Sequence, residues 1–396
     1  MSEEMFDGLL QGSHRCHPED LIDLIATHAA PVGLHDPVLY LADLQQVNLV
    51  RVPRGRIRPP IEPDERLPVD TTAVGRVFRR NQVRTVPIPD GRCQIWLPLL
   101  DGTERLGVLR LTVDADARHR LDPVLGRRAR RLASLVALLV VSKRAYSDTL
   151  VELTRRDDMS LSAEMQWGLL PPLTFSTERI VVTGALEPAY QVAGDTFDYG
   201  IVDDGVHLAL FDAAGHDLNS AVVVGLAAAA YRRGRRAGLD LVELGDTIDR
   251  TVAARFGPPE LVTGVLAHFD AGTGGLQWVL RGHPPPVLLR DGKWVKTLEI
   301  KPGLPMGIGV HRPTELGTVQ LEPGDRLLFY TDGVTEARDA EGAEFGLDRL
   351  VDFVIRREAD QLPPPETLRR LIRTILDHQH GHLQDDATVL LVEWRP

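Results

Sequence analysis

Cysteine is nearly absent from this sequence of 396 residues, which contains only Cys16 and Cys93. Two cysteines cannot build the disulfide framework of a small secreted protein, so a reducing compartment is expected. Long apolar runs are also missing, because the longest, Leu135 to Val141, is far shorter than the roughly 20 residues that span a bilayer. The first residues include Glu3 and Glu4, whereas a signal peptide begins with basic residues. We therefore expect a cytoplasmic protein that does not bind a membrane.

Basic residues are also scarce, but only in one part of the chain. The first 150 residues hold 21 Lys and Arg against 19 Asp and Glu, whereas the remainder holds 24 against 37. This asymmetry predicts two units of different chemistry, and the length agrees with two or three domains. The acidic second half would be repelled by a phosphate backbone, so no nucleic-acid partner is expected.

Residues 1–120 are predicted to form one small α/β domain. Apolar residues with helical spacing indicate a helix over residues 17–29 and a shorter one over residues 70–80. Two strand-like runs lie between them, and alternating residues around Asp101-Gly102 predict a hairpin over residues 95–113.

A long helix is expected to follow over residues 121–170, the predicted linker. Two series of positions repeat every seven residues, and most of them are apolar. They are Leu125, Leu132, Leu139, Tyr146 and Leu153, with Ala129, Val136, Lys143 and Leu150 as companions. This spacing predicts a coiled coil and hence a parallel homodimer through the linker helix. The alternative is a single amphipathic helix packed on its own domain, and Lys143 weakens the coiled-coil interpretation.

Residues 171–396 are predicted to form a second α/β domain in which apolar strands end at aspartates. These aspartates are Asp195, Asp212, Asp332 and Asp385. Each could be an ordinary Asp-Gly turn. Brought together at one end of a sheet sandwich, however, the four carboxylates would repel one another and would bind a hard divalent cation such as Mg²⁺ or Mn²⁺.

Eight motifs in this half resemble the PPM family of metal-dependent serine/threonine phosphatases, in its SpoIIE/RsbU-like bacterial branch. They are AEMQWGLLPP (163–172), AGDTFD (193–198), DAAGHD (212–217), GHPPP (282–286), GLPMGI (303–308), YTDGVTEARD (330–339), FG (345–346) and DDATVL (385–390). In residues 17–115, DTTAVGRVFRRNQVRTV (70–86) and IWLPLLDGTERLGVLRLTV (95–113) resemble a GAF domain. The fold class expected is therefore α/β (α+β), with a GAF-like sensor domain, a helical linker and a PPM-type α-β-β-α sandwich.

The PPM resemblance also implies roles for individual residues. Asp212 would bridge two Mn²⁺ or Mg²⁺ ions, and the carbonyl of Ala213 would bind one of them. Asp195 would bind the second ion, and Asp332 and Asp385 the first. Asp198 is a further candidate ligand or a structural acid. Asp385 is expected to reach the site and its neighbour Asp386 is not, because successive residues of a strand point to opposite faces.

The function implied is hydrolysis of phosphoserine or phosphothreonine on a protein by a hydroxide that two metal ions activate. The resemblance implies an anti-sigma-factor antagonist as the substrate and regulation by the GAF-like domain. That domain could hold a small-molecule ligand near Trp96, Phe78 and Tyr40. The alternative is a catalytically degenerate scaffold that binds a signalling partner.

Five further residues have less certain roles. His216 is expected to begin a helix, or to act as a general acid, and His283 to organise a tight turn. Arg281 could bind phosphate or pair with an acid. Asp217 and Ala193 replace the glycines usual in the branch, and Asp217 adds charge near the expected metal site.

Overall fold

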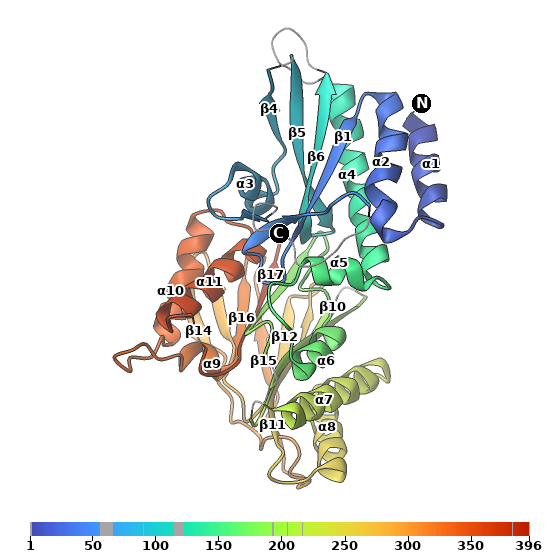
Figure 1. Ribbon diagram of the computed structural model, residues 1–396. Helices are drawn as coiled ribbons and strands as arrows, with labels where there is room; N and C mark the ends of the chain where they lie inside the picture. Colours follow the sequence, from blue (N-terminus) through green and yellow to red (C-terminus); the bar gives the residue numbers. More distant parts are fainter. Residues whose placement is uncertain are drawn as a thin grey trace. The chain divides into compact units, whose positions relative to one another are not determined.

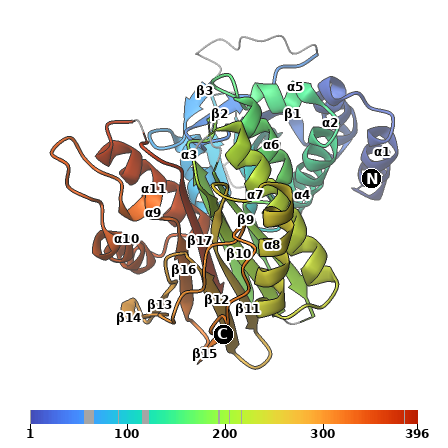
Figure 2. The same ribbon diagram turned by 90° about the horizontal axis from the view of Figure 1, so that it is seen from below.

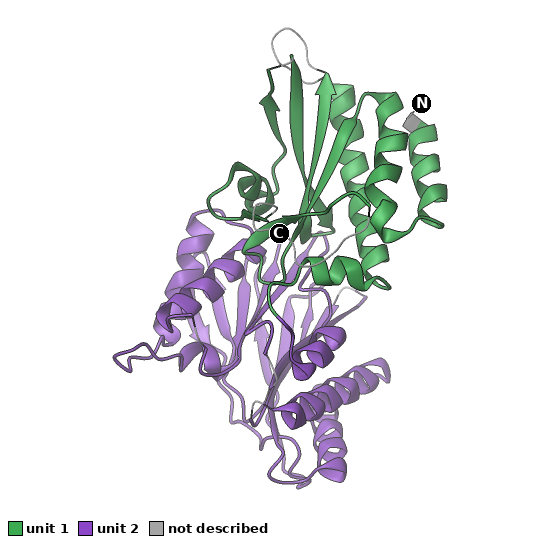
Figure 3. Cartoon of the chain, in the orientation of Figure 1, with its two compact units in different colours: residues 1–157 green, residues 158–396 purple. Residues whose placement is uncertain are grey.

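Two compact units make up the chain, residues 1–157 and residues 158–396 (Figure 3). The computed structural model describes residues 2–55, 66–89, 91–114, 122–191, 194–203, 205–215, 217–381 and 383–395. The boundary between the units lies inside the stretch 121–170 that the sequence assigns to a linker. In these described ranges, no helix is both long enough and apolar enough to cross a membrane.

The first unit is built on a six-stranded antiparallel sheet with the strand order β3-β2-β1-β6-β5-β4 (Figure 1). Its elements are α1 (Ser2–Ser13), η1 (Pro18–Asp20), α2 (Leu21–Ala29), η2 (Ala30–Val32), β1 (His35–Ala42), β2 (Asn48–Arg51), β3 (Arg66–Pro68), α3 (Ala73–Arg80), β4 (Arg84–Pro87), β5 (Arg92–Asp101), β6 (Glu104–Asp114), α4 (Pro123–Arg144) and α5 (Asp148–Leu153). Side chains of β5 alternate between buried and half-buried, as a strand with one face on a core requires.

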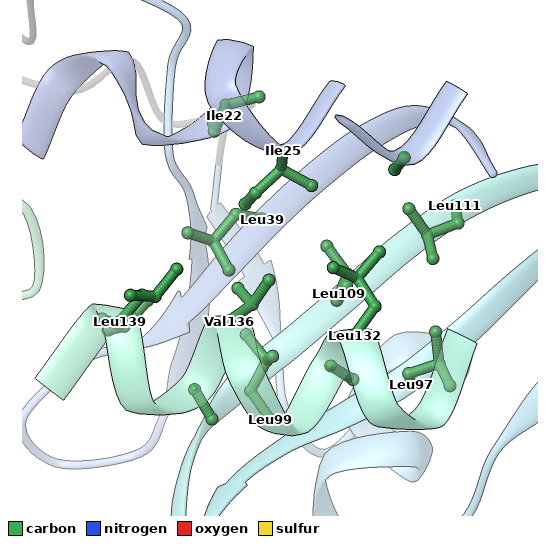
Figure 4. Packing of buried hydrophobic residues seen from close by; sticks show 14 of the residues in the cluster. Ile22, Ile25, Leu39, Leu97, Leu99, Leu109, Leu111, Leu132, Val136 and Leu139 are labelled. Atoms are coloured by element: carbon green, nitrogen blue, oxygen red, sulfur yellow. The ribbon is translucent and has the colours of Figure 1, made fainter. Parts of the chain in front are cut away.

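The main core of this unit lies between the sheet and helices α1, α2 and α4. Figure 4 shows Ile25 of α2, Leu109 of β6 and Val136 of α4 packed together. A smaller cluster on the other face includes Phe78 of α3 and Tyr40 of β1. Apolar residues thus cover both faces of the sheet.

The predicted uninterrupted helix and its coiled-coil seam are wrong. Helix α4 begins after Asp122, whose carboxylate accepts the N–H of Val124 at 3.1 Å, and it ends at Arg144. The seam position Val136 is buried in the unit's own core, and buried Lys143 donates to the carbonyls of Ser13 and Cys16 at 2.6 and 2.7 Å. The alternative, an amphipathic helix packed on its own domain, is confirmed.

The second unit contains two sheets with helices outside them. Its elements are α6 (Leu161–Leu169), β7 (Thr174–Ser176), β8 (Ile180–Glu187), β9 (Asp195–Val202), β10 (Gly205–Ala213), α7 (Leu218–Arg236), α8 (Leu241–Arg255), β11 (Val262–Asp270), β12 (Gly275–Arg281), β13 (Val287–Arg290), β14 (Lys293–Thr297), β15 (Gly317–Gln320), β16 (Arg326–Tyr330), α9 (Asp332–Thr335), α10 (Leu347–Ala359), α11 (Pro364–His378) and β17 (Ala387–Trp394). The five-stranded sheet has the order β15-β12-β11-β10-β9, and the six-stranded sheet has the order β14-β13-β16-β17-β8-β7.

Three apolar clusters hold these layers together. Leu210 of β10 and Phe329 of β16 belong to the cluster between the two sheets. Helices α7 and α8 pack on the outer face of the five-stranded sheet, and α10 and α11 pack on the outer face of the six-stranded sheet (Figure 2). The predicted α-β-β-α sandwich is therefore confirmed, and its two sheets face each other.

Candidate metal centre

The five-stranded sheet contributes two aspartates and a threonine to one row of side chains. Asp212 of β10 lies directly opposite Asp195 of β9 on one side and Thr263 of β11 on the other. Phe197 and Leu210, which follow the same alternation as Asp195 and Asp212, belong to the core between the sheets. The two carboxylates therefore lie at the end of that core, on the face directed at the second sheet.

The six-stranded sheet brings two more aspartates to the same place. Asp332 is the first residue of α9, directly after β16, and Asp385 lies just before β17. Thr331 joins the sheets, since its hydroxyl donates to Asp195 Oδ2 at 2.7 Å and accepts the N–H of Thr388 at 3.0 Å. All four aspartates selected from the sequence thus belong to one region of the second unit.

Asp386 also reaches this region, which corrects the expectation that only one acid of the pair would. Its carboxylate accepts the N–H groups of Gly194 and Asp195 at 2.7 and 3.3 Å. The alternation of faces does not apply to Asp385 and Asp386 because β17 begins only at Ala387. The signal in the sequence was that both acids precede the apolar run.

The carboxyl groups strongly affect one another. Burial raises the pKa of Asp195 well above its ordinary value, and the charges of Asp212 and Asp386 raise it further. Burial and then the charges of Asp332, Asp385 and Asp386 raise the pKa of Asp212 to about 7. Burial and Asp385 raise the pKa of Asp332. Among the described residues, the charges that raise these three pKa values belong to other aspartates, so the cluster is one that bound cations would stabilise.

The oxygen atoms of these side chains are suitable ligands for divalent metal ions, although they do not yet surround a single position. Carboxylate and carbonyl oxygens are the ligands that Mg²⁺ and Mn²⁺ prefer. In the part of the chain that the structure describes, no three acidic, histidine or cysteine side chains are already placed to hold one ion.

Two glycines let the backbone segments of the site approach one another closely. A Cβ on Gly333 would lie 2.0 Å from the carbonyl oxygen of Asp386. A Cβ on Gly194 would lie 3.0 Å from the carbonyl oxygen of Ala213, whose N–H donates to the Gly194 carbonyl at 2.9 Å. The Ala213 carbonyl therefore lies beside the segment that carries Asp195.

Asp198 does not join the cluster. It lies three residues after Asp195 on β9, on the opposite face of the sheet, and it is 1% exposed. There it accepts a hydrogen bond from Arg232 of α7 and lies 3.5 Å from Nη2 of Arg235. Its environment is that of the structural acid, the second of the two roles considered for it.

Two of the other candidate residues have partners away from the carboxylate cluster. Asp217 caps α7 by accepting the N–H of Ser220 at 3.1 Å. Arg281 pairs with Asp246 of α8 at 3.3 Å and donates to Thr314 at 2.6 Å, so of its two possible roles it has that of an acid's partner. His216 and Ala193 lie outside the described residues.

His283 is 4% exposed, and its Nδ1 lies 3.0 Å from the hydroxyl oxygen of Thr263. The sequence pattern did not single out Thr263. It is connected to the site by the strand register, which places it opposite Asp212 and which no local sequence pattern records.

Comparison with known proteins finds similarity to bacterial phosphatases. Residues 202–395 match the family model described as Stage II sporulation protein E (SpoIIE). Protein IcfG of Synechocystis is 24% identical over 270 residues, which cover 60% of this chain and 41% of that protein. Phosphoserine phosphatase RsbU of Bacillus subtilis is 21% identical over 241 residues, which cover 60% of this chain and 70% of RsbU.

Among solved structures, the SiaA-PP2C domain of Pseudomonas aeruginosa is similar over 59% of this chain and 94% of that domain, with 22% identity and a TM-score of 0.47. The chain spans less than half the length of IcfG, so the similarity concerns the phosphatase domain and not whole proteins. Residues 202–395 of the second unit therefore form a SpoIIE-type domain, and the chain is similar to the SpoIIE/RsbU-like branch of the PPM-type phosphatases.

Proposed function

We propose that this chain is a protein serine/threonine phosphatase that depends on two Mn²⁺ or Mg²⁺ ions. The observation that carries the proposal is the meeting of acidic side chains from two sheets, where the charges of neighbouring aspartates raise the pKa of Asp195, Asp212 and Asp332. The matched family and the relative named a phosphoserine phosphatase support it.

Each acidic residue has a place in this proposal. Asp212 lies between Asp195 on its own sheet and the acids of the other sheet, so we assign it the bridging position. Asp195 would hold the second ion, and Asp332 and Asp385 the first, with the carbonyl of Ala213 as a further ligand. When bound, the two ions would supply a hydroxide nucleophile near neutral pH and would neutralise charge on the phosphoryl oxygens.

For the substrate, we propose a phosphorylated anti-sigma-factor antagonist. RsbU and RsbP of Bacillus subtilis are both named phosphoserine phosphatases, and this chain covers 70% of the first and 59% of the second. A two-metal site would supply hydroxide as the nucleophile, so the reaction would need no protein nucleophile. Buried Cys93 on β5 of the first unit is accordingly given no part in the reaction.

We also propose that the first unit is a GAF-like sensor that regulates the second. Within the second unit, helix α6 packs against α7, where Arg232 donates both to the carbonyl of Leu169 and to Asp198. Because α7 starts only five residues after Ala213, a change in α6 would be transmitted to the metal site.

A sensor needs a signal, and we propose a small molecule that binds near Tyr40, Trp96 and Phe78. The rings of Tyr40 and Trp96 lie 5.9 Å apart, and Arg110 lies over Trp96.

We also propose that the chain forms a homodimer through the outward face of α4. Leu138 is 55% exposed there, and nearby Tyr146 is 65% exposed.

The phosphatase proposal is tested by turnover of a phosphoserine peptide and of para-nitrophenyl phosphate with Mn²⁺. We expect Asp212→Asn to lower kcat/KM at least a hundredfold, because the ions lose their shared ligand. Asp217→Asn is the matched control, since asparagine also caps a helix and Asp217 lies outside the carboxylate cluster. A wild-type chain that binds partners but shows no turnover would support the scaffold alternative instead.

A further inference from the structure

We infer that Thr263 and His283 act together as positioning residues that hold the Asp212 carboxylate in the orientation needed to bind metal ions. This inference rests on the proposed phosphatase function. It concerns two residues that ligate nothing themselves. Asp212 is the residue before the last of β10, Thr263 is the second residue of β11, and His283 lies two residues after the end of β12.

The strand register places the three side chains in a row. Thr263 is the direct cross-strand neighbour of Asp212, and its hydroxyl, as a hydrogen-bond donor, opposes the rise in the pKa of the Asp212 carboxyl. The same hydroxyl oxygen lies 3.0 Å from Nδ1 of His283. One hydroxyl is therefore shared between the proposed bridging ligand and a buried imidazole.

The direction of the hydrogen bonds follows from the chemistry of the groups. An ionised carboxylate can only accept, and a hydroxyl donates one hydrogen, so Thr263 donates to Asp212. Its lone pair is then free to accept the Nδ1–H of His283. Burial lowers the pKa of His283 to about 3, with the Tyr330 carbonyl opposing this only in part, so the ring is neutral. A neutral ring carries one N–H, and we place it on Nδ1, toward Thr263, because the Asp212 carboxylate takes the only hydrogen of the hydroxyl.

The turn that carries His283 has little freedom to move. Gly282 has φ of +70°, in the left-handed region, and a Cβ at this position would lie 2.7 Å from Cγ of Pro305. His283 itself is almost completely buried. The imidazole of His283 therefore holds the Thr263 hydroxyl in one orientation, and this hydroxyl in turn orients one carboxylate oxygen of Asp212. Such outer partners orient metal-binding side chains, and their loss costs roughly ten- to hundredfold in metal affinity.

The test measures Mn²⁺ binding to the full chain by electron paramagnetic resonance, together with the thermal midpoint in EDTA. We expect Thr263→Val and His283→Leu each to weaken Mn²⁺ binding by roughly tenfold or more. Thr263→Ser should restore binding because it keeps the hydroxyl, and His283→Asn should restore part of it because its amide N–H can replace Nδ1–H. Thr318→Val is the matched control in the same sheet, distant in register from Asp212.

A double variant separates this role from a structural one. If His283 acts through Thr263, then Thr263→Val with His283→Leu weakens Mn²⁺ binding no more than Thr263→Val alone. The inference would be overturned if the two substitutions weakened Mn²⁺ binding additively. It would also be overturned if the loss of Mn²⁺ binding paralleled a fall in the thermal midpoint in EDTA and Thr263→Ser did not restore binding. If Asp212→Asn weakens Mn²⁺ binding and Thr263→Val does not, this inference fails alone. If the wild-type chain binds no Mn²⁺, the proposed function fails as well.

Discussion

At the scale of single residues, the carboxyl groups of the metal centre make the metal-free protein sensitive to pH. Folding raises the pKa of Asp195, Asp212 and Asp332 above the ordinary value of 3.8. The folded state therefore binds more protons than the unfolded state in the range between the ordinary and the raised values. By linkage, metal-free stability falls as the pH rises through this range, which for Asp212 extends to about 7.

We expect the thermal midpoint in EDTA to be several degrees lower at pH 8 than at pH 5.5, and Mn²⁺ to reverse the loss at pH 8. Differential scanning fluorimetry across this range measures both effects. Asp212→Asn should flatten the profile in EDTA, because an amide does not titrate, whereas Asp217→Asn should leave its slope unchanged. A midpoint that rises between pH 5.5 and pH 8 in EDTA would contradict this account of the cluster.

Individual residues also show where sequence reasoning succeeded and where it stopped. Asp195, Asp212, Asp332 and Asp385 could be selected because each ends or precedes an apolar strand. The face that a side chain occupies depends on the exact strand boundary, and a one-residue error misplaces it. This is why the contact of Asp386 with the site was missed. The pairing of Asp198 with Arg232 depends on how α7 crosses the sheet, which no local pattern records.

At the scale of elements, helix α4 demonstrates what an apolar repeat can and cannot specify. The helix itself was predictable from Asp122 as its N-cap and from the apolar spacing that follows. The element against which the helix packs was not predictable, because its buried stripe of apolar residues has the same spacing whether it packs on a sheet or on a second helix. The end of the helix was also not predictable, because the seven-residue spacing of apolar positions continues unchanged across the interruption at residues 145–147.

The role of α4 is tested by comparing two leucines of the same helix. Leu132→Ala should lower the free energy of unfolding by about 2–5 kcal/mol, because Leu132 is fully buried in the first unit's core. Leu138→Ala, at an exposed position, should change it by less than about 0.5 kcal/mol. Urea unfolding followed by circular dichroism measures both values. A Leu132→Ala loss that grows as the protein is diluted would instead indicate a seam between two chains.

At the scale of the whole molecule, the proposed regulation predicts that the first unit changes the phosphatase reaction. Deletion of residues 1–157 follows the boundary between the two compact units. We expect it to alter kcat/KM or the Mn²⁺ concentration for half-maximal rate at least threefold, because α6 would lose its input. The unaltered full chain, purified and assayed in parallel, is the control. If the truncated chain matches the full chain in both quantities, the proposed coupling is wrong.

The position of β17 in the six-stranded sheet has a consequence for the order in which the enzyme is made. This strand, Ala387–Trp394, lies between β16 and β8, and Asp385 and Asp386 directly precede it. A growing chain that has left the ribosome as far as α11 therefore has Asp195 and Asp212 but neither acid of the last pair. Because residues nearly 200 positions apart must meet, the acidic cluster is complete only after translation has passed β17. If the proposed function holds, partly synthesised chains would therefore lack phosphatase activity.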